Sequence, residues 1–232
     1  MSAPPNAVVQ FQPASDQSLL VHLGDSISVD AHQRVRKLLH LLQSRPIHGV
    51  RNLHPAYCSI LIDFDALQLT HASLQTSLQD YAAQLGAFAP AEPRNVSIPT
   101  CYGGEFGPDL DDVARLHSLT PSQVIELHAS VSYTVYFLGF VPGFAYLGEM
   151  PAALATQRLA TPRRSTPAGS VGIADNQTGI YPFATPGGWR IIGRTPLAMF
   201  RSDRANMSLL NTGDRVRFTP ITNAEFAAFR QA

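Results

Sequence analysis

The second half of the chain consists of short β-type runs that glycine and proline separate, with no helical pattern between them. After Ser130 these runs are VSYTVYFL, SVGIA, WRIIG, LAMFR and RVRFT, and 12 of the 16 glycines lie between Gly103 and Gly193. Strands joined by tight turns pair with one another, and a sheet that closes on itself has no unpaired edge. The pattern therefore predicts a closed or nearly closed β-barrel.

The first ninety residues show two other periodicities. Apolar residues of Ala31–Leu42 recur at the spacing of one helix face, whereas YCSILIDF at residues 57–64 alternates as a strand does. A second helical pattern begins at Thr70 and ends before Gly86. The order strand, helix, strands, helix, strand predicts a small α/β sandwich of the split βαβ type, so that the whole chain is α+β.

A proline-rich segment separates these two regions. FAPAEPRN, residues 88–95, has two prolines and no periodicity, which predicts a linker. We expect an N-terminal α/β domain over residues 1–90 and a β-barrel domain over residues 91–232. Two helices lead the second domain. One begins near Pro108, and the other at Thr120, where the threonine, the proline after it and Gln123 form a capping-box pattern.

The charged residues exclude several classes of function. The formal net charge is zero, so no basic field is available to bind nucleic acid. The only lysine, Lys37, lies in a helical pattern, so a Walker-type phosphate loop is absent. The same scarcity of lysine argues against a Schiff-base enzyme or a biotin-carrying domain. No apolar run reaches the ~20 residues that span a bilayer, and no signal-peptide pattern opens the chain. We expect a cytoplasmic protein that does not contact membranes.

Aromatic residues in glycine-rich turns are candidates for a pocket wall. FLGFVPGFAYLG, residues 137–148, displays Phe140 and Phe144 on an irregular loop, and the only tryptophan, Trp189, follows two glycines. Such rings line a ligand pocket or a partner groove, or else they close one end of the barrel.

The polar residues near these turns form a recognition set rather than a set of nucleophiles. Gln177, Thr178, Tyr181 and Arg194 together donate and accept the hydrogen bonds that a carboxylate or an amide requires, although Gln and Thr also satisfy turn backbone. Two more arginines favour an anionic substrate, or else extend from a solvated loop; these are Arg163 and Arg164.

The histidines restrict the catalytic chemistry. None of the eight lies beyond residue 128, so the barrel strands hold no Ser-His-Asp or Cys-His set of their own. His128 is the candidate for proton transfer, and its alternative is a partly buried residue at the negative end of a helix. The acidic run EFGPDLDD, residues 105–112, has no His or Cys partner, so we predict helix capping and no metal site.

Seven ordered blocks resemble one family. The chain is similar over residues 96–220 to the B subunit of 5-oxoprolinase, in the family that includes the kinase inhibitor KipI and proteins named allophanate hydrolase subunit 1. The blocks are YGGEFGPDLDDVA, ELHASVSYTVYFLGFVPGFAYLG, LATPRR, PAGSVGIA, QTGIYP, TPGGWRIIGRTPL and GDRVRF.

This resemblance implies an α/β domain followed by a cyclophilin-like barrel, the arrangement of a carboxyltransferase domain. It implies one subunit, inactive alone, of an enzyme that opens 5-oxo-L-proline to L-glutamate with ATP hydrolysis. The implied partners are an A subunit of the LamB/YcsF type and a C subunit related to biotin-dependent carboxylases. Without a Walker lysine, we expect ATP to bind on another subunit or at a shared site.

The same resemblance implies roles for the candidate residues. 5-Oxoproline carries a carboxylate, for which we predict Arg194, and a lactam, for which we predict Gln177 and Thr178. His128 would transfer a proton, and Phe140, Phe144 and Trp189 would form the pocket wall.

The chain departs from the family between Arg164 and Pro167, where relatives carry a longer loop, and this leaves the roles of Arg163 and Arg164 open. The alternative functions are a KipI-like inhibitor of a sensor histidine kinase and a subunit that handles allophanate or urea.

Overall fold

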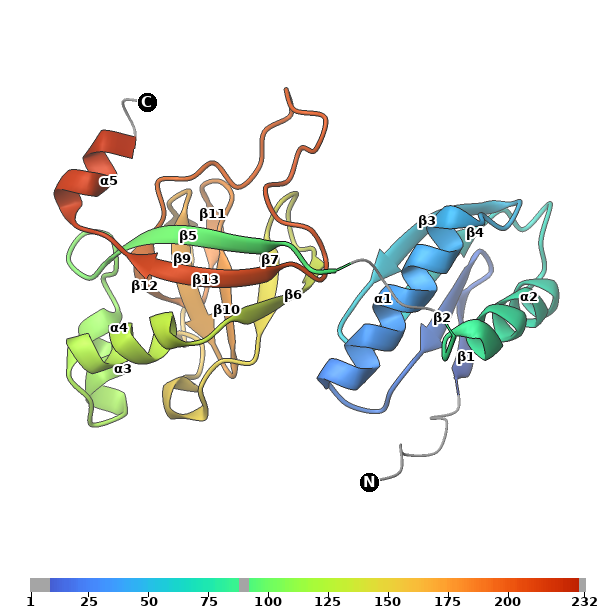
Figure 1. Cartoon of the computed structure of the whole chain (residues 1–232), viewed down its shortest axis with the longest axis horizontal. Coiled ribbons are helices and arrows are strands. Elements are labelled where there is room, and N and C mark those ends of the chain that lie inside the picture. Colours follow the sequence, from blue (N-terminus) through green and yellow to red (C-terminus); the bar gives the residue numbers. More distant parts are fainter. Residues whose placement is uncertain (1–8, 88–91, 230–232) are drawn as a thin grey trace. The chain divides into compact units, whose positions relative to one another are not determined.

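The computed structural model of the chain describes residues 9–87 and 92–229 (Figure 1). The chain divides into two compact units, residues 1–92 and residues 93–232. Part of the predicted linker, residues 88–91, lies outside the described residues, and strand β5 begins at Asn95. The predicted α+β class, with a closed barrel in the second unit, is confirmed.

The first unit is a four-stranded antiparallel sheet with two helices, in the order β1-β2-β4-β3. Strands β2 and β3 are joined through α1 with β4 inserted between them, which is a split βαβ unit. The fourth strand comes from a β1–β2 hairpin at the start of the chain, not from a strand after α2 as the sequence order predicted. The elements are β1 Gln10–Ser15, β2 Ser18–His22, α1 Val29–Ser44, β3 Val50–Pro55, β4 Ser59–Phe64 and α2 His71–Gln84.

One apolar cluster holds this unit together. Both helices pack their buried leucines, such as Leu38 and Leu74, against residues of β2 and β4, such as Val21 and Ile60. Strand β4 alternates between partly buried and fully buried positions, as its sequence predicted. The polar face of each helix remains in solvent.

The second unit is a closed seven-stranded barrel in the order β10-β7-β6-β13-β5-β12-β9 (Figure 1). Strands β5 and β13 pair in parallel, and the β9–β10 hairpin completes the ring. The strands are β5 Asn95–Tyr102, β6 Tyr133–Leu138, β7 Ala145–Gly148, β9 Ser170–Ala174, β10 Gln177–Ile180, β12 Arg190–Arg194 and β13 Arg215–Pro220.

Shorter elements surround the barrel. Thr120 and Gln123 form the predicted capping box of α4. The run LAMFR, residues 197–201, is not the strand that its sequence predicted, because only Phe200 pairs, in a single bridge with Ser208. The elements are α3 Leu110–Leu116, α4 Pro121–Ser130, a 3₁₀ turn η1 Ala152–Leu154, a ribbon of β8 Arg163–Thr166 and β11 Thr185–Gly187, and α5 Asn223–Phe229.

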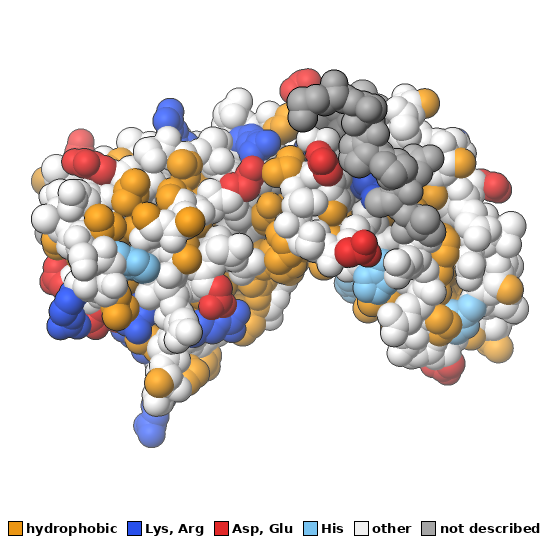
Figure 2. Space-filling model, turned by 90° about the horizontal axis from the view of Figure 1, so that it is seen from below, with side chains coloured by type: hydrophobic (Ala, Val, Ile, Leu, Met, Phe, Trp, Pro, Cys, Tyr) orange, Lys and Arg blue, Asp and Glu red, His pale blue; other side chains and the backbone are white. Residues whose placement is uncertain are grey.

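The surface in view in Figure 2 carries acidic and basic side chains with apolar side chains between them. Among residues 9–87 and 92–229, none of the helices has the length and hydropathy that crossing a bilayer requires.

Candidate functional site

Two apolar clusters share one wall of the barrel, with one cluster on each side of it. Ile173 of β9 and Ile192 of β12 belong to the cluster inside the barrel. Their neighbours Ala174 and Ile191 belong to a second cluster. Because successive residues of a strand point to opposite faces, this second cluster lies on the outer face of the wall.

A hollow of about 250 Å³, here called the aromatic pocket, adjoins the outer cluster. The structure brings together four residues that the sequence predicted for a binding site, and their role in binding stays a prediction; they are Phe140, Phe144, Tyr181 and Trp189. The other lining residues are Tyr146, Arg158, Pro162, Pro186, Gly187 and Gly188.

The rings of the pocket pack edge to face around Phe144. Its centroid lies 5.1 Å from that of Tyr181, 5.5 Å from that of Trp189 and 4.9 Å from that of Tyr146. Such pairs stabilise a wall beyond the area that they bury, so the pocket is formed in advance of any ligand. Phe140 differs from these rings, because 60% of it is exposed and its φ is 65°, in the left-handed region.

The hydroxyl of Tyr181 lies at the inner side of the pocket. Its oxygen accepts a hydrogen bond from the backbone of Trp189, and it sits so close to Gly187 that a β-carbon there would collide with it. Burial raises the pKa of Tyr181, and the Trp189 bond offsets part of that rise. The hydroxyl is therefore protonated at neutral pH, and its proton is a hydrogen-bond donor.

Arg158 is the charged residue among those that line the aromatic pocket. Its guanidinium lies 5.9 Å from the centroid of the Trp189 ring. The carboxylate of Asp175 is 3.9 Å away, and both side chains are more than half exposed. An ion pair of that length and exposure is weak, so Arg158 remains available to an anionic ligand.

Next to Trp189, a partly buried ion pair connects β8, β12 and the start of α3. Asp109 accepts a hydrogen bond from Arg163 at 2.5 Å and another from the backbone N–H of Ile191 at 2.6 Å. Arg163 also donates to the carbonyl of Trp189 at 3.3 Å. Arg163 therefore supports the pocket wall, and it is not the solvated loop residue of the sequence-based alternative. Its neighbour Arg164 is exposed.

His128 lies inside the barrel with none of its surface exposed. The hydroxyl of Thr178 donates to the carbonyl of Gly172 at 3.0 Å, so it accepts from Nε2 of His128, also at 3.0 Å. The Nδ1 atom then accepts from the hydroxyl of Tyr102 at 2.7 Å. This chain of three bonds satisfies both ring nitrogens and fixes the tautomer.

Burial lowers the pKa of His128 to about 3, so the ring is neutral at physiological pH. Its ring packs 4.4 Å from that of Phe218 in the barrel core. Neither solvent nor a ligand in the aromatic pocket reaches it. The full burial of the ring and the pairing of both its nitrogens do not fit the predicted role in proton transfer, and they agree with a structural role in the core.

The predicted recognition set does not converge on one site. Thr178 is buried and bonded to His128, so it does not meet a lactam. The guanidinium of Arg194 lies 5.5 Å from the ring of Phe106, and neither Arg194 nor Gln177 lines the aromatic pocket. Of the four residues in that set, Tyr181 is the one that lines the pocket.

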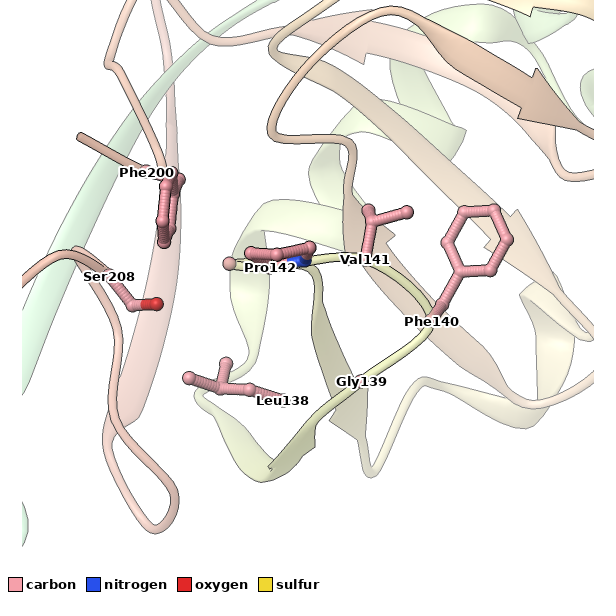
Figure 3. A pocket seen from close by; sticks show the side chains of 8 residues that line it. Leu138, Gly139, Phe140, Val141, Pro142, Phe200 and Ser208 are labelled. Atoms are coloured by element: carbon pink, nitrogen blue, oxygen red, sulfur yellow. The ribbon is translucent and has the colours of Figure 1, made fainter. Parts of the chain in front are cut away.

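A second hollow of about 410 Å³, here called the loop groove, lies beside the first. Phe140 lines both hollows. Figure 3 shows Phe200 and Ser208 across the loop groove from Leu138 and Pro142, while the ring of Phe140 points away from them. The groove is open and mostly apolar.

The carboxylates of the acidic run at residues 105–112 bond to separate partners. Asp109 forms no side-chain cap to α3, contrary to the prediction, because its carboxylate bonds to β8 and β12. Asp112 pairs instead with Arg115 one turn later. In the part of the chain that the structure describes, no group of three or more His, Cys, Asp or Glu residues is placed to hold a metal ion.

Comparison with known proteins shows the family to which the chain belongs. Residues 9–210 match the family described as carboxyltransferase domain, subdomain C and D. The chain is 37% identical over 232 residues to the B subunit of 5-oxoprolinase from Bacillus subtilis (strain 168), with 96% of this chain and 97% of that one covered. It is 42% identical over 210 residues to the protein of that name from Escherichia coli O157:H7, which covers 88% and 93%. The chain belongs to the family of 5-oxoprolinase B subunits.

A solved structure shares the fold of this member of the B-subunit family. The crystal structure of TTHA0988 superposes with a TM-score of 0.79 and 33% sequence identity. The superposition covers 90% of this chain but 41% of that one, so the two units correspond to less than half of a longer polypeptide.

In this member of the 5-oxoprolinase B-subunit family, the residues that line the aromatic pocket provide apolar walls and one charged group but no nucleophile. The pocket has aromatic walls, the hydroxyls of two tyrosines, Tyr146 and Tyr181, and one guanidinium. Sequence reasoning missed Arg158, since a single arginine in an irregular loop shows no periodicity. The available signal was its position before LATPRR, one of the blocks of the family resemblance.

Proposed function

We propose that this chain is the B subunit of an ATP-dependent 5-oxoprolinase, which opens 5-oxo-L-proline to L-glutamate. The observation that carries this proposal is the extent of the likeness to proteins of that name. At 37% identity it runs through 96% of this chain and 97% of the relative, so it includes both structural units.

The chemistry of the reaction agrees with a pocket that binds but does not attack. A lactam is a poor electrophile, so ATP first phosphorylates its carbonyl oxygen and releases ADP. One water then adds to the activated carbon, and the ring C–N bond breaks with the nitrogen leaving as the amine, which gives γ-glutamyl phosphate. A second water hydrolyses this acyl phosphate to L-glutamate and phosphate. In this proposal the aromatic pocket holds and orients the ring, while the groups that handle phosphate come from elsewhere.

The proposed location of ATP is another subunit or a site shared with one. The chain has one lysine, Lys37, and its Nζ atom donates to the carbonyl of Leu85 in the first unit. The aromatic pocket, at about 250 Å³, is below the ~300–1,000 Å³ of sites for drug-sized ligands. It therefore suits a small metabolite better than a nucleotide.

We propose two partners, an A subunit of the LamB/YcsF type and a C subunit related to biotin-dependent carboxylases. The coverage of 41% on TTHA0988 supports the view that a unit of this kind operates beside further protein. The relatives are named as one subunit of an enzyme, which agrees with this view.

The test is reconstitution with omission. The chain is mixed with its candidate partners, 5-oxo-L-proline and ATP, and glutamate and ADP are measured with each subunit left out in turn. We expect product when all three are present and none when this chain is omitted. Full activity without this chain, or no activity from three folded subunits, contradicts the proposal.

A regulatory role is the second candidate, and the exposed Phe140 beside the loop groove favours it. In this role the chain binds a sensor histidine kinase and inhibits its autophosphorylation. The assay adds purified chain to the kinases of its host. Undiminished phosphorylation of every kinase tested removes this candidate.

A further inference from the structure

The aromatic pocket combines apolar rings with the hydroxyls of Tyr146 and Tyr181 and the guanidinium of Arg158. The hydroxyl of Tyr181 lies beside Gly187, and Arg158 approaches the pocket near Asp175. A ligand that bonds to both Tyr181 and Arg158 carries a hydrogen-bond acceptor and a negative charge. The hollow of about 250 Å³ limits such a ligand to about the size of a single small ring.

Arg158 is the arginine available to a ligand in the pocket, because the neighbouring arginines have other partners. Arg163 is held by Asp109, Arg190 donates to the carbonyl of Gln157 at 3.0 Å, and Arg194 packs over Phe106. None of these three residues lines the pocket, whereas Arg158 does.

The electrostatic influence of Arg158 also extends into the pocket. Burial raises the pKa of Tyr146 and of Tyr181, and in both cases the positive charge of Arg158 lowers the pKa in part. The guanidinium is therefore near both hydroxyls. Its position over the Trp189 ring limits its motion, and a planar guanidinium presents two parallel N–H groups to a carboxylate.

We propose that Arg158 is the carboxylate-binding residue of the aromatic pocket. The pocket selects a small cyclic amide that carries one carboxylate, with the amide carbonyl on the hydroxyl of Tyr181 and the ring against Trp189. The choice of 5-oxoproline as this ligand rests on the proposed function. This assignment replaces Arg194, which the sequence predicted for the same role.

The single tryptophan gives a direct measurement, since Trp189 lies in the pocket and no other residue contributes to tryptophan emission. The full chain is titrated with 5-oxo-L-proline, and with 2-pyrrolidinone, which has the same lactam ring but no carboxylate. We expect a saturable change in emission with 5-oxo-L-proline and binding at least about tenfold weaker with 2-pyrrolidinone, since bonds between charged groups are the strong ones.

The variant Arg158→Gln separates charge from shape. It should weaken 5-oxo-L-proline binding by about tenfold or more and leave 2-pyrrolidinone binding unchanged. Arg158→Lys keeps the charge without the planar fork, so its affinity for 5-oxo-L-proline should fall between those of the unmodified chain and Arg158→Gln. The matched control is Arg164→Gln, an exposed arginine of the same segment outside the pocket, and it should bind as the unmodified chain does.

The assembled enzyme gives an independent readout. There, Arg158→Gln should raise the KM for 5-oxo-L-proline by about tenfold with a smaller change in kcat. The inference fails if the variant matches the unmodified chain in both assays, or if 2-pyrrolidinone binds as tightly as 5-oxo-L-proline.

The two proposals fail in different ways. Activity that requires this chain but is indifferent to Arg158→Gln contradicts the inference and leaves the proposed function standing. Binding of 5-oxo-L-proline that depends on Arg158, without any glutamate from the three subunits, contradicts the function and leaves the pocket assignment standing.

Discussion

The inner and outer sides of the barrel wall place polar groups in opposite situations. On the inner side, His128 and Thr178 bond to each other and to Tyr102 and Gly172, so every donor and acceptor of the imidazole is used. On the outer side, Arg158 is 59% exposed and has a weak ion pair. The histidine that the sequence predicted for proton transfer is therefore enclosed in a bonded network, whereas an arginine from an irregular loop lines the aromatic pocket.

The largest expected effect comes from removing the inner network. His128→Ala deletes a buried ring and leaves the hydroxyl of Tyr102 without its acceptor. We expect the free energy of unfolding to fall by about 3 kcal/mol or more, measured by urea denaturation. A variant that is as stable as the unmodified chain but inactive in the reconstituted enzyme would reverse the comparison and return His128 to a catalytic role.

The next effect concerns the ion pair behind Trp189. Asp109→Ala removes the side-chain acceptor of the Ile191 N–H and one of the two acceptors of Arg163, and we expect a loss of about 2 kcal/mol in stability. The emission of Trp189 should shift as strand β12, which begins at the next residue, loosens. Arg164→Gln is the control on the same strand as Arg163 and should stay within about 0.5 kcal/mol. Equal melting temperatures for the two variants would show that Asp109 does not hold the wall.

Acid should lower the free energy of unfolding through His128 on the inner side of the barrel wall. Its pKa is about 3 in the folded chain against 6.5 in the unfolded chain, so below pH 6.5 the unfolded state binds a proton that the folded state does not. The contribution of this group to the free energy of unfolding is constant above pH 6.5. Between pH 6.5 and pH 3 the free energy of unfolding falls by about 1.4 kcal/mol for each pH unit of acidification. Urea denaturation at several pH values measures it, and the difference between the unmodified chain and His128→Ala isolates this group. Parallel pH profiles for the two proteins would contradict the assignment.

The smallest effect tests the outer side. Asp175→Asn removes the carboxylate that competes with a ligand for Arg158, and Asp175 sits at a φ of 52° that asparagine also tolerates. We expect 5-oxo-L-proline to bind about two- to threefold more tightly by Trp189 emission, as an exposed ion pair is worth ~0.2–1 kcal/mol. Weaker binding would mean that Asp175 helps to position Arg158.

Local sequence patterns predicted those parts of the fold that depend on residues close together in the chain. The alternation of residues 57–64 and the capping box at Thr120 each reappear in the structure. The run at residues 197–201 has the composition of a strand, but it pairs with the chain only in a single bridge between Phe200 and Ser208. Strand pairing depends on which segment lies alongside, and that information is not in the run itself.

The sequence by itself determined the α+β class, the glycine-rich barrel, the aromatic residues that meet at Phe144 and the family. The tertiary structure decided which polar residues share a site. Thr178 and Tyr181 are three positions apart in the chain, yet one is sealed in the core with His128 and the other lines the pocket with Arg158. The side of a strand on which a residue falls, and the loop that folds over that side, are set by the register of the closed barrel. No local pattern encodes that register, because each strand acquires it from its neighbours.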